Sequence, residues 1–190
     1  MARLSIQLLG PFQVMLGGEP VTGFVSDKAR ALLAYLAVET GRPQRRETLA
    51  GLLWPDTSEG AARTSLRTAL ANVRQVIGDA EAHPAYLDIT RQTIQLNQES
   101  DTQVDVSRFT HLLEAALLPM EADALNTVGI QHLEEAVALY RDGFLQGFSL
   151  ADSVLFEEWA LLRREQLQRQ ALGALHRLAA YYEVNGEPLR

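Results

Sequence analysis

The stretch Ser58–Gly78 constrains the fold most, because it is an amphipathic helix with both ends marked. Its apolar residues recur at intervals of three and four, which predicts one buried stripe. These residues are Leu66, Ala69, Leu70, Val73 and Ile77. The other side carries Arg63, Arg67 and Arg74, with Thr64, Thr68, Asn72 and Gln75 beside them. We expect Ser58 to be the N-cap and Gly78 to be the glycine that follows the C-cap.

The polar side of this helix has the chemistry needed in the major groove of DNA. Arginine can bond guanine bidentately, asparagine and glutamine can bond adenine, and threonine can reach a phosphate or a thymine methyl group. No acidic residue lies between Gly60 and Gly78. Arginine-bearing helix faces are nevertheless often only solvated. The helix alone therefore leaves both interpretations open, and the neighbouring segments must decide.

Two shorter helices are expected before this one. The first begins at Ser26 and buries Leu32, Leu33, Leu36 and Ala37; the second spans about Arg45–Trp54, buries Leu49, Leu52 and Leu53, and is stopped by Pro55. Four cations lie near their starts, where they can face backbone phosphates or only water. They are Lys28, Arg30, Arg45 and Arg46.

Short strands flank the three helices. Leu4, Ile6 and Leu8 alternate with polar residues, which predicts an N-terminal antiparallel sheet. Two further alternating runs, 86–89 and 93–96, surround Thr90-Arg91-Gln92 and predict a hairpin with Arg91 at its tip. Three helices followed by a hairpin form a winged helix, in which Arg91 can reach a neighbouring minor groove. The alternative is a plain edge hairpin.

The second half predicts helices only. After a polar connector at 97–103, Ser107 is the expected cap of a helix that buries Phe109, Leu112, Leu113 and Leu117. Two more helices are expected over about 124–140 and from Val154 or Phe156 to Tyr182. Their offsets indicate tetratricopeptide-like packing, and we expect this domain to be truncated at Arg190. An apolar surface around Leu172, Leu175 and Leu178 would then favour a homodimer through the helical domain.

The charge is unevenly divided along the chain, although the net charge is −7. Residues 1–97 hold 10 Arg and Lys against 9 Asp and Glu, whereas residues 98–190 hold 7 against 15. This asymmetry predicts two domains with these boundaries and different partners. Because the first half is barely basic, any DNA binding must depend on the local placement of arginines.

Several classes of site are disfavoured. The chain has no cysteine, which excludes disulfides and thiolate chemistry and fits a reducing cytoplasm, and no run approaches the ~18 apolar residues of a membrane span. His111 with Glu114 and His132 with Glu135 have a chelating spacing, but no further ligands accompany them. We therefore expect no metal, no cofactor and no enzymatic activity; an enzyme remains an alternative only if a further domain follows.

Four motifs carry a resemblance to a known family. They are Leu9-Gly10-Pro11-Phe12, Ala29-Arg30-Ala31-Leu32-Leu33, Leu52-Leu53-Trp54-Pro55-Asp56, and Ala62-Arg63-Thr64-Ser65-Leu66 with Val73-Arg74. Together they resemble the antibiotic-regulatory activators of actinomycetes, the SARP family, from Leu4 to Arg190. That family joins an OmpR-like winged helix to a bacterial transcriptional activation domain. The sequence departs from it at Ala85, where a glycine usually precedes the wing tyrosine.

The resemblance implies roles for individual residues. The recognition helix would present Arg63, Ser65, Arg67, Thr68 and Arg74. The loop that contacts RNA polymerase in this fold would consist of Trp54, Pro55, Asp56, Thr57, Ser58, Glu59 and Gly60. Members of the family bind direct repeats as two copies.

These observations predict an α+β protein, with an OmpR-like winged helix over 1–97 and an all-α tetratricopeptide-like domain over 98–190. The leading hypothesis is a cytoplasmic transcriptional activator that inserts the 61–77 helix into the major groove of promoter DNA and recruits RNA polymerase. The candidate DNA-binding residues are Lys28, Arg30, Arg45, Arg46, Arg63, Thr64, Ser65, Arg67, Thr68, Asn72, Arg74 and Arg91. The alternative is a protein-interaction module whose helical half binds a partner and whose winged helix does not bind DNA.

Overall fold

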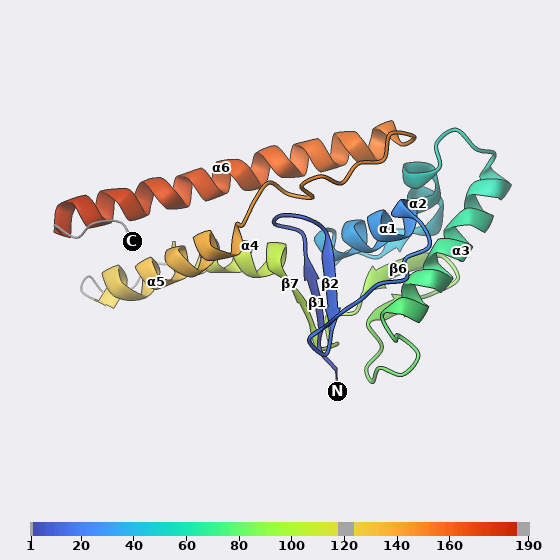
Figure 1. Cartoon of the computed structure of the whole chain (residues 1–190), viewed down its shortest axis with the longest axis horizontal. Coiled ribbons are helices and arrows are strands. Elements are labelled where there is room, and N and C mark those ends of the chain that lie inside the picture. Colours follow the sequence, from blue (N-terminus) through green and yellow to red (C-terminus); the bar gives the residue numbers. More distant parts are fainter. Residues whose placement is uncertain (1, 118–123, 186–190) are drawn as a thin grey trace.

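A computed structural model describes residues 2–117 and 124–185, with side chains omitted for 124–127. Within these ranges the strands are β1 (Leu4–Gln7), β2 (Gln13–Leu16), β3 (Glu19–Pro20), β4 (Gln44–Arg45), β5 (Leu87–Ile89), β6 (Thr93–Leu96) and β7 (Thr102–Val104). The helices are α1 (Asp27–Val38), α2 (Arg46–Leu53), α3 (Glu59–Val76), α4 (Asp105–Ala115), α5 (Ala124–Leu139) and α6 (Val154–Asn185). The architecture is the predicted one, a winged helix followed by a helical region (Figure 1).

The N-terminal sheet has the order β3-β2-β1-β7. Its first three strands are antiparallel, and the expected alternation holds because Leu4, Ile6 and Leu8 are fully buried. The fourth strand, β7, pairs with β1 in parallel, and Ile6 lies opposite Val104. This pairing joins the connector to the N-terminal sheet, so the stretch expected to be a polar linker is partly a strand.

The three helices of the winged helix begin and end close to their predicted positions. Ser26 caps α1 by accepting a hydrogen bond from the Ala29 N–H at 3.2 Å. In α2 the N-cap is Arg45, which makes no side-chain capping bond within the described chain. One short strand adds to the predicted hairpin, because β4 pairs with β6 and gives the sheet order β4-β6-β5. The wing is thereby attached to the start of α2.

Helix α3 has the predicted amphipathic character. Leu66, Leu70, Val73 and Ile77 are buried. At its end, Gly78 adopts a left-handed conformation with φ +65°. The Gly78 N–H donates to the Gln75 carbonyl at 3.3 Å and the Asp79 N–H donates to the Arg74 carbonyl at 2.9 Å, which is the Schellman pattern that satisfies the last carbonyls of a helix. Ser58 occupies the N-cap position, although its hydroxyl makes no capping bond to any described residue.

The helical half differs from expectation at three residues. Ser107 lies inside the first turn of α4, because the helix begins at Asp105 and Val104 is the N-cap. Leu117 is exposed, since it follows the end of α4. Leu178 is buried against Leu133 of α5, whereas Leu172 and Leu175 are exposed as expected.

One continuous apolar core runs through both halves of the described chain. It includes Leu32 and Leu49 of the winged helix together with Phe109, Phe156 and Leu167 of the helical half. The long α6 accordingly extends along one side of the molecule, from above α1 and α2 to above α5 (Figure 1). Its first turns pack against the winged helix and its later turns pack against α5.

A buried carboxylate also joins the two halves. Asp105, whose side chain is 9% exposed, accepts hydrogen bonds from the backbone N–H groups of Leu8, Leu9 and Val106 at 2.8–2.9 Å. Arg141 lies 3.4 Å from the same group. Burial raises the pKa of the Asp105 carboxyl, while these N–H donors and Arg141 act in the lowering direction. Both carboxylate oxygens are therefore used as acceptors.

We predict that Asp105→Asn lowers the free energy of unfolding by about 1–3 kcal/mol, because an amide NH₂ would then face backbone N–H groups that need an acceptor. Urea denaturation measures this change. Asp88→Asn is the matched control, since Asp88 is exposed and bonds only the Gln95 side chain among the described residues. Equal stabilities of the two variants would contradict the assigned role of Asp105.

Candidate nucleic-acid interface

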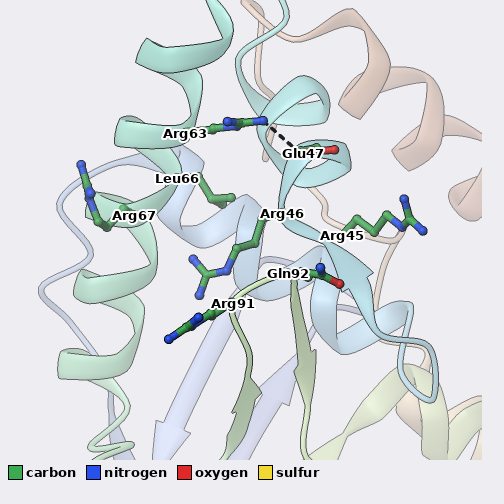
Figure 2. A pocket seen from close by; sticks show the side chains of 8 residues that line it. All are labelled: Arg45, Arg46, Glu47, Arg63, Leu66, Arg67, Arg91 and Gln92. Carbon is green, nitrogen blue, oxygen red and sulfur yellow. Dashed lines mark hydrogen bonds and ion pairs between the residues drawn. The ribbon is translucent and has the colours of Figure 1, made fainter.

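A cleft of about 480 Å³ lies between α2, α3 and the wing, and five arginines line it. Its lining residues are Arg45, Arg46, Glu47, Arg63, Leu66, Arg67, Arg91 and Gln92 (Figure 2). Only one acidic residue belongs to this set. Such a concentration of guanidinium groups favours a polyanionic ligand, although the whole chain is acidic.

Arg67 is the most available of the cleft arginines on α3. Its side chain is exposed and makes no hydrogen bond or ion pair to any residue that the structure describes. In Figure 2, Arg46 and Arg91 extend toward α3, Arg67 extends outward from α3, and Arg45 points away from the other three. Arg46, Arg67 and Arg91 come from α2, α3 and the wing, so three separate elements contribute positive charge to one cleft.

Arg63 is held by carboxylates. Its Nη2 lies 2.9 Å from Glu47 Oε1 on α2 and 2.5 Å from Glu59 Oε1 one turn earlier on α3. All three side chains are more than half exposed, so these ion pairs contribute little to stability. They do offset the charge of Arg63 and direct its guanidinium toward α2 (Figure 2).

The wing tip is shaped by Thr90. Its hydroxyl accepts hydrogen bonds from the backbone N–H groups of Gln92 at 3.1 Å and Thr93 at 2.8 Å. The Thr90 carbonyl accepts a bond from Arg46 Nε at 3.1 Å. Arg91 is therefore exposed on a turn that is fixed by its own residues and braced by α2.

The other candidate residues of α3 divide into outward and inward groups. Thr64 and Thr68 are exposed, and their hydroxyls donate to carbonyls one turn back at 3.0 and 3.2 Å. Ser65 is half-buried. The prediction that Asn72 faces outward is wrong, because it is 9% exposed, accepts from the Val25 N–H and donates to the Gly23 carbonyl. Asn72 anchors the loop before α1 to α3.

Arg74 has a structural partner. Its Nε lies 2.8 Å from Asp79, whose buried carboxylate also accepts the Leu87 N–H at 3.0 Å. The Arg74 side chain is still 48% exposed. Arg74 therefore compensates a buried charge at the end of α3, while part of its guanidinium faces solvent.

The predicted phosphate contacts outside α3 differ in whether they face the cleft. Lys28 faces inward, since its Nζ donates to the Leu53 carbonyl at 2.5 Å and pairs with Asp152 at 2.8 Å. Its side chain is only 16% exposed, so the structure contradicts its assignment as a phosphate contact. Arg30 pairs with Asp27 and lies over the Phe24 ring, outside the cleft lining. Arg45 and Arg46 both line the cleft.

The segment between α2 and α3 forms an exposed loop. Trp54 is half-buried against the core, and Pro55 to Ser58 are exposed; Glu59 and Gly60, expected to belong to this loop, are exposed in the first turn of α3. Thr57 bonds the Trp54 carbonyl through its hydroxyl at 3.1 Å. The exposed loop therefore begins at a half-buried aromatic residue.

Metal-binding clusters and membrane-spanning helices are both absent from the part of the chain that the structure describes. Within 2–117 and 124–185, no group of three or more His, Cys, Asp and Glu side chains is arranged to hold a metal ion. In the same part of the chain, no helix is long and apolar enough to cross a membrane.

Comparison with known protein families finds two matches that cover consecutive parts of the chain. Residues 22–93 match the family described as transcriptional regulatory protein, C terminal, which covers α1 to the wing. Residues 104–186 match the bacterial transcriptional activator domain. The residues that match the first family include all those that line the cleft, and the match to the second family begins at the end of β7.

Individual proteins show the same likeness. The transcriptional regulatory protein EmbR of Mycobacterium tuberculosis is 35% identical over 82 residues, which cover 43% of this chain and 21% of EmbR. The transcriptional regulator RedD of Streptomyces coelicolor is 29% identical over 207 aligned positions, which cover 95% of this chain and 55% of RedD. A solved structure of Mycobacterium tuberculosis EmbR, in complex with a low affinity phosphopeptide, superposes with a TM-score of 0.76 at 26% identity. It covers 98% of this chain and 47% of that one. The chain thus spans little more than half of RedD and a smaller part of EmbR.

We predict that Glu47→Gln strengthens the binding of polyanions, because it removes the one acidic side chain of the cleft and releases Arg63 from one ion pair. Retention on immobilised heparin measures this effect, and the variant should elute at higher salt than the parent. Glu19→Gln on β3 is the control, since it changes the net charge equally and lies outside the cleft lining. An equal shift for both variants would show that only net charge matters.

Proposed function

We propose, from the premise that this chain belongs to the SARP-type transcriptional regulators, that it binds double-stranded promoter DNA through the arginine cleft and activates transcription there. The observation that carries this proposal is that Arg46, Arg67 and Arg91, from three elements, line one cleft. Phosphate neutralisation by such groups supplies most of the non-specific affinity for DNA. No bond is made or broken in this mechanism.

In the proposed complex, the 61–77 helix enters the major groove and the wing lies over the adjacent minor groove. Arg67 would contact a base edge, because its side chain is exposed and makes no ion pair with the described residues. Thr64, Ser65 and Thr68 would approach the same groove, and Arg63 would need to leave Glu47 or Glu59 to do so. Arg45, Arg46 and the exposed part of Arg74 would contact phosphates, and Arg91 would reach the minor groove.

Activation would occur by recruitment of RNA polymerase through the loop from Trp54 to Gly60. Pro55 to Ser58 of this loop, with Glu59 and Gly60 in the first turn of α3, are exposed and accessible to a partner while the rest of α3 lies in the major groove. We further propose that residues 1–97 act as the DNA-binding domain and residues 98–190 as the activation domain.

Fluorescence anisotropy with a labelled duplex from the region upstream of the protein's own gene tests DNA binding. The logarithm of the affinity should fall linearly with the logarithm of salt concentration, with a slope of about −0.9 for each phosphate neutralised. A weak response that does not depend on salt would favour the alternative, a protein-interaction module. EmbR was solved with a phosphopeptide, so a phosphopeptide is a reasonable first ligand for that alternative.

We predict that Arg67→Ala weakens binding to the specific duplex by roughly 1–3 kcal/mol, the usual value of one base contact. The same anisotropy titration measures it, and the loss should be smaller on a scrambled duplex. Arg177→Ala is the matched control, because Arg177 is an exposed arginine on α6. If Arg67→Ala titrates the specific duplex like the parent, Arg67 does not contact a base.

We also propose that two copies associate through the outer face of α6. Leu161, Leu162, Leu172 and Leu175 are 39–67% exposed there. Apolar side chains grouped on one exposed helix are typical of an interface.

We predict that Leu162→Glu lowers the mass measured by light scattering toward that of a monomer. Gln92→Glu, which changes the net charge equally at the exposed wing tip, should leave the parent's mass unchanged; a monomeric parent would refute the dimer.

A further inference from the structure

The C-terminus of α2 is completed by residues from elsewhere in the chain. The last carbonyls of a helix have no partner within the helix and need donors from outside. Ser153 Oγ donates to the Leu52 carbonyl at 2.5 Å, and Ser153 is fully buried. Lys28 Nζ donates to the Leu53 carbonyl at 2.5 Å. One donor belongs to the helical half and the other to α1.

These two donors are themselves connected. Lys28 Nζ pairs with Asp152 Oδ2 at 2.8 Å, next to Ser153 in the chain. The ammonium also lies 5.4 Å from the centre of the Trp54 ring, which is within the range of a cation–π contact. Ser153 Oγ further accepts from the Phe156 N–H at 3.3 Å, so the same hydroxyl caps the start of α6 and the end of α2.

The start of α6 is held in place against α1 as well. Glu39, the C-cap of α1, accepts a bond from Trp159 Nε1 at 2.9 Å and pairs with Arg163 at 2.6 Å. The Trp159 ring packs against Tyr35 with ring centres 4.9 Å apart. Ser153 is therefore held by its bond to the first turn of α6, and that part of α6 is in turn held against α1.

The loop at Trp54–Gly60 begins directly after the two capped carbonyls. We infer that Ser153 and Lys28 are positioning residues, through which the helical half fixes the conformation of this loop for its partner. This inference rests on the proposed contact between the loop and RNA polymerase. It assigns the helical half a direct effect on the winged helix, and it accounts for the inward placement of Lys28.

Ser153→Ala in the full chain tests the inference with three measurements. Hydrogen exchange of the Trp54 and Thr57 amides, which bond the Ala50 and Trp54 carbonyls, should accelerate about five- to tenfold relative to the Gln92 and Thr93 amides of the wing tip, as expected for the loss of one hydrogen bond. Transcription with purified RNA polymerase should fall by a similar factor. Affinity for the duplex should stay within about twofold, because Ser153 lies outside the cleft lining.

Two further variants complete the design. Lys28→Met removes the second donor without changing the cap of α6 and should have the same three effects, so the test survives if Ser153→Ala fails to fold. Ser107→Ala, an exposed serine on α4, is the control and should resemble the parent.

The outcomes separate this inference from the proposed function. Faster loop exchange with reduced transcription supports both. Faster loop exchange with unchanged transcription supports the positioning role and refutes the polymerase contact. If neither variant accelerates exchange of the loop amides more than exchange of the wing-tip amides, the positioning role is overturned, whatever the transcription assay gives.

Discussion

The burial of one face of α3 is the interaction on which the arrangement of the cleft depends. Fully burying a leucine or valine stabilises the fold by about 1.5–3 kcal/mol, whereas an exposed ion pair contributes about 0–1 kcal/mol. Leu66, Leu70 and Val73 are all at most 5% exposed. The apolar side therefore determines the rotation of the helix, and the pairs between Arg63 and the glutamates only adjust a side chain on a helix already fixed. Asn72 adds to this by bonding the loop before α1.

The local charge of the cleft depends on what each arginine bonds. Arg46 donates to a backbone carbonyl, which leaves its full positive charge in place, while Arg63 is paired with two carboxylates. A carbonyl thus orients a cation without neutralising it. This distinction explains how a chain with a net charge of −7 retains a positive cleft. Most of its acidic residues lie in the half that does not line it.

Much of this arrangement could be predicted from the sequence, because it depends on local periodicity. The start of α1, the apolar stripe of α3 and the hairpin with Arg91 at its tip follow from spacing, capping residues and turn residues. Periodicity cannot identify a distant partner, however. Lys28 and Asn72 have the chemistry of DNA contacts, yet their partners lie at Asp152 and in the Gly23–Val25 loop. The parallel pairing of β7 with β1 was missed for the same reason, since three residues carry too short a pattern. Ser107 was expected to cap α4, but Asp105 lies earlier in the chain, and its bonds to Leu8 and Leu9 connect the start of this helix to the N-terminal strands.

Most of these long-range bonds connect the winged helix to the helical half. Asp105 binds the backbone after β1, Glu39 binds Trp159 and Arg163, and Ser153 binds the end of α2. All three bonds use a buried or half-buried polar group, whose loss costs more than the loss of a surface pair. Together with the continuous apolar core, they oppose independent motion of the winged helix and the helical half. A ligand or partner that alters the first turns of α6 therefore acts on the same residues that hold the end of α2, and its effect reaches the exposed loop without passing through the cleft.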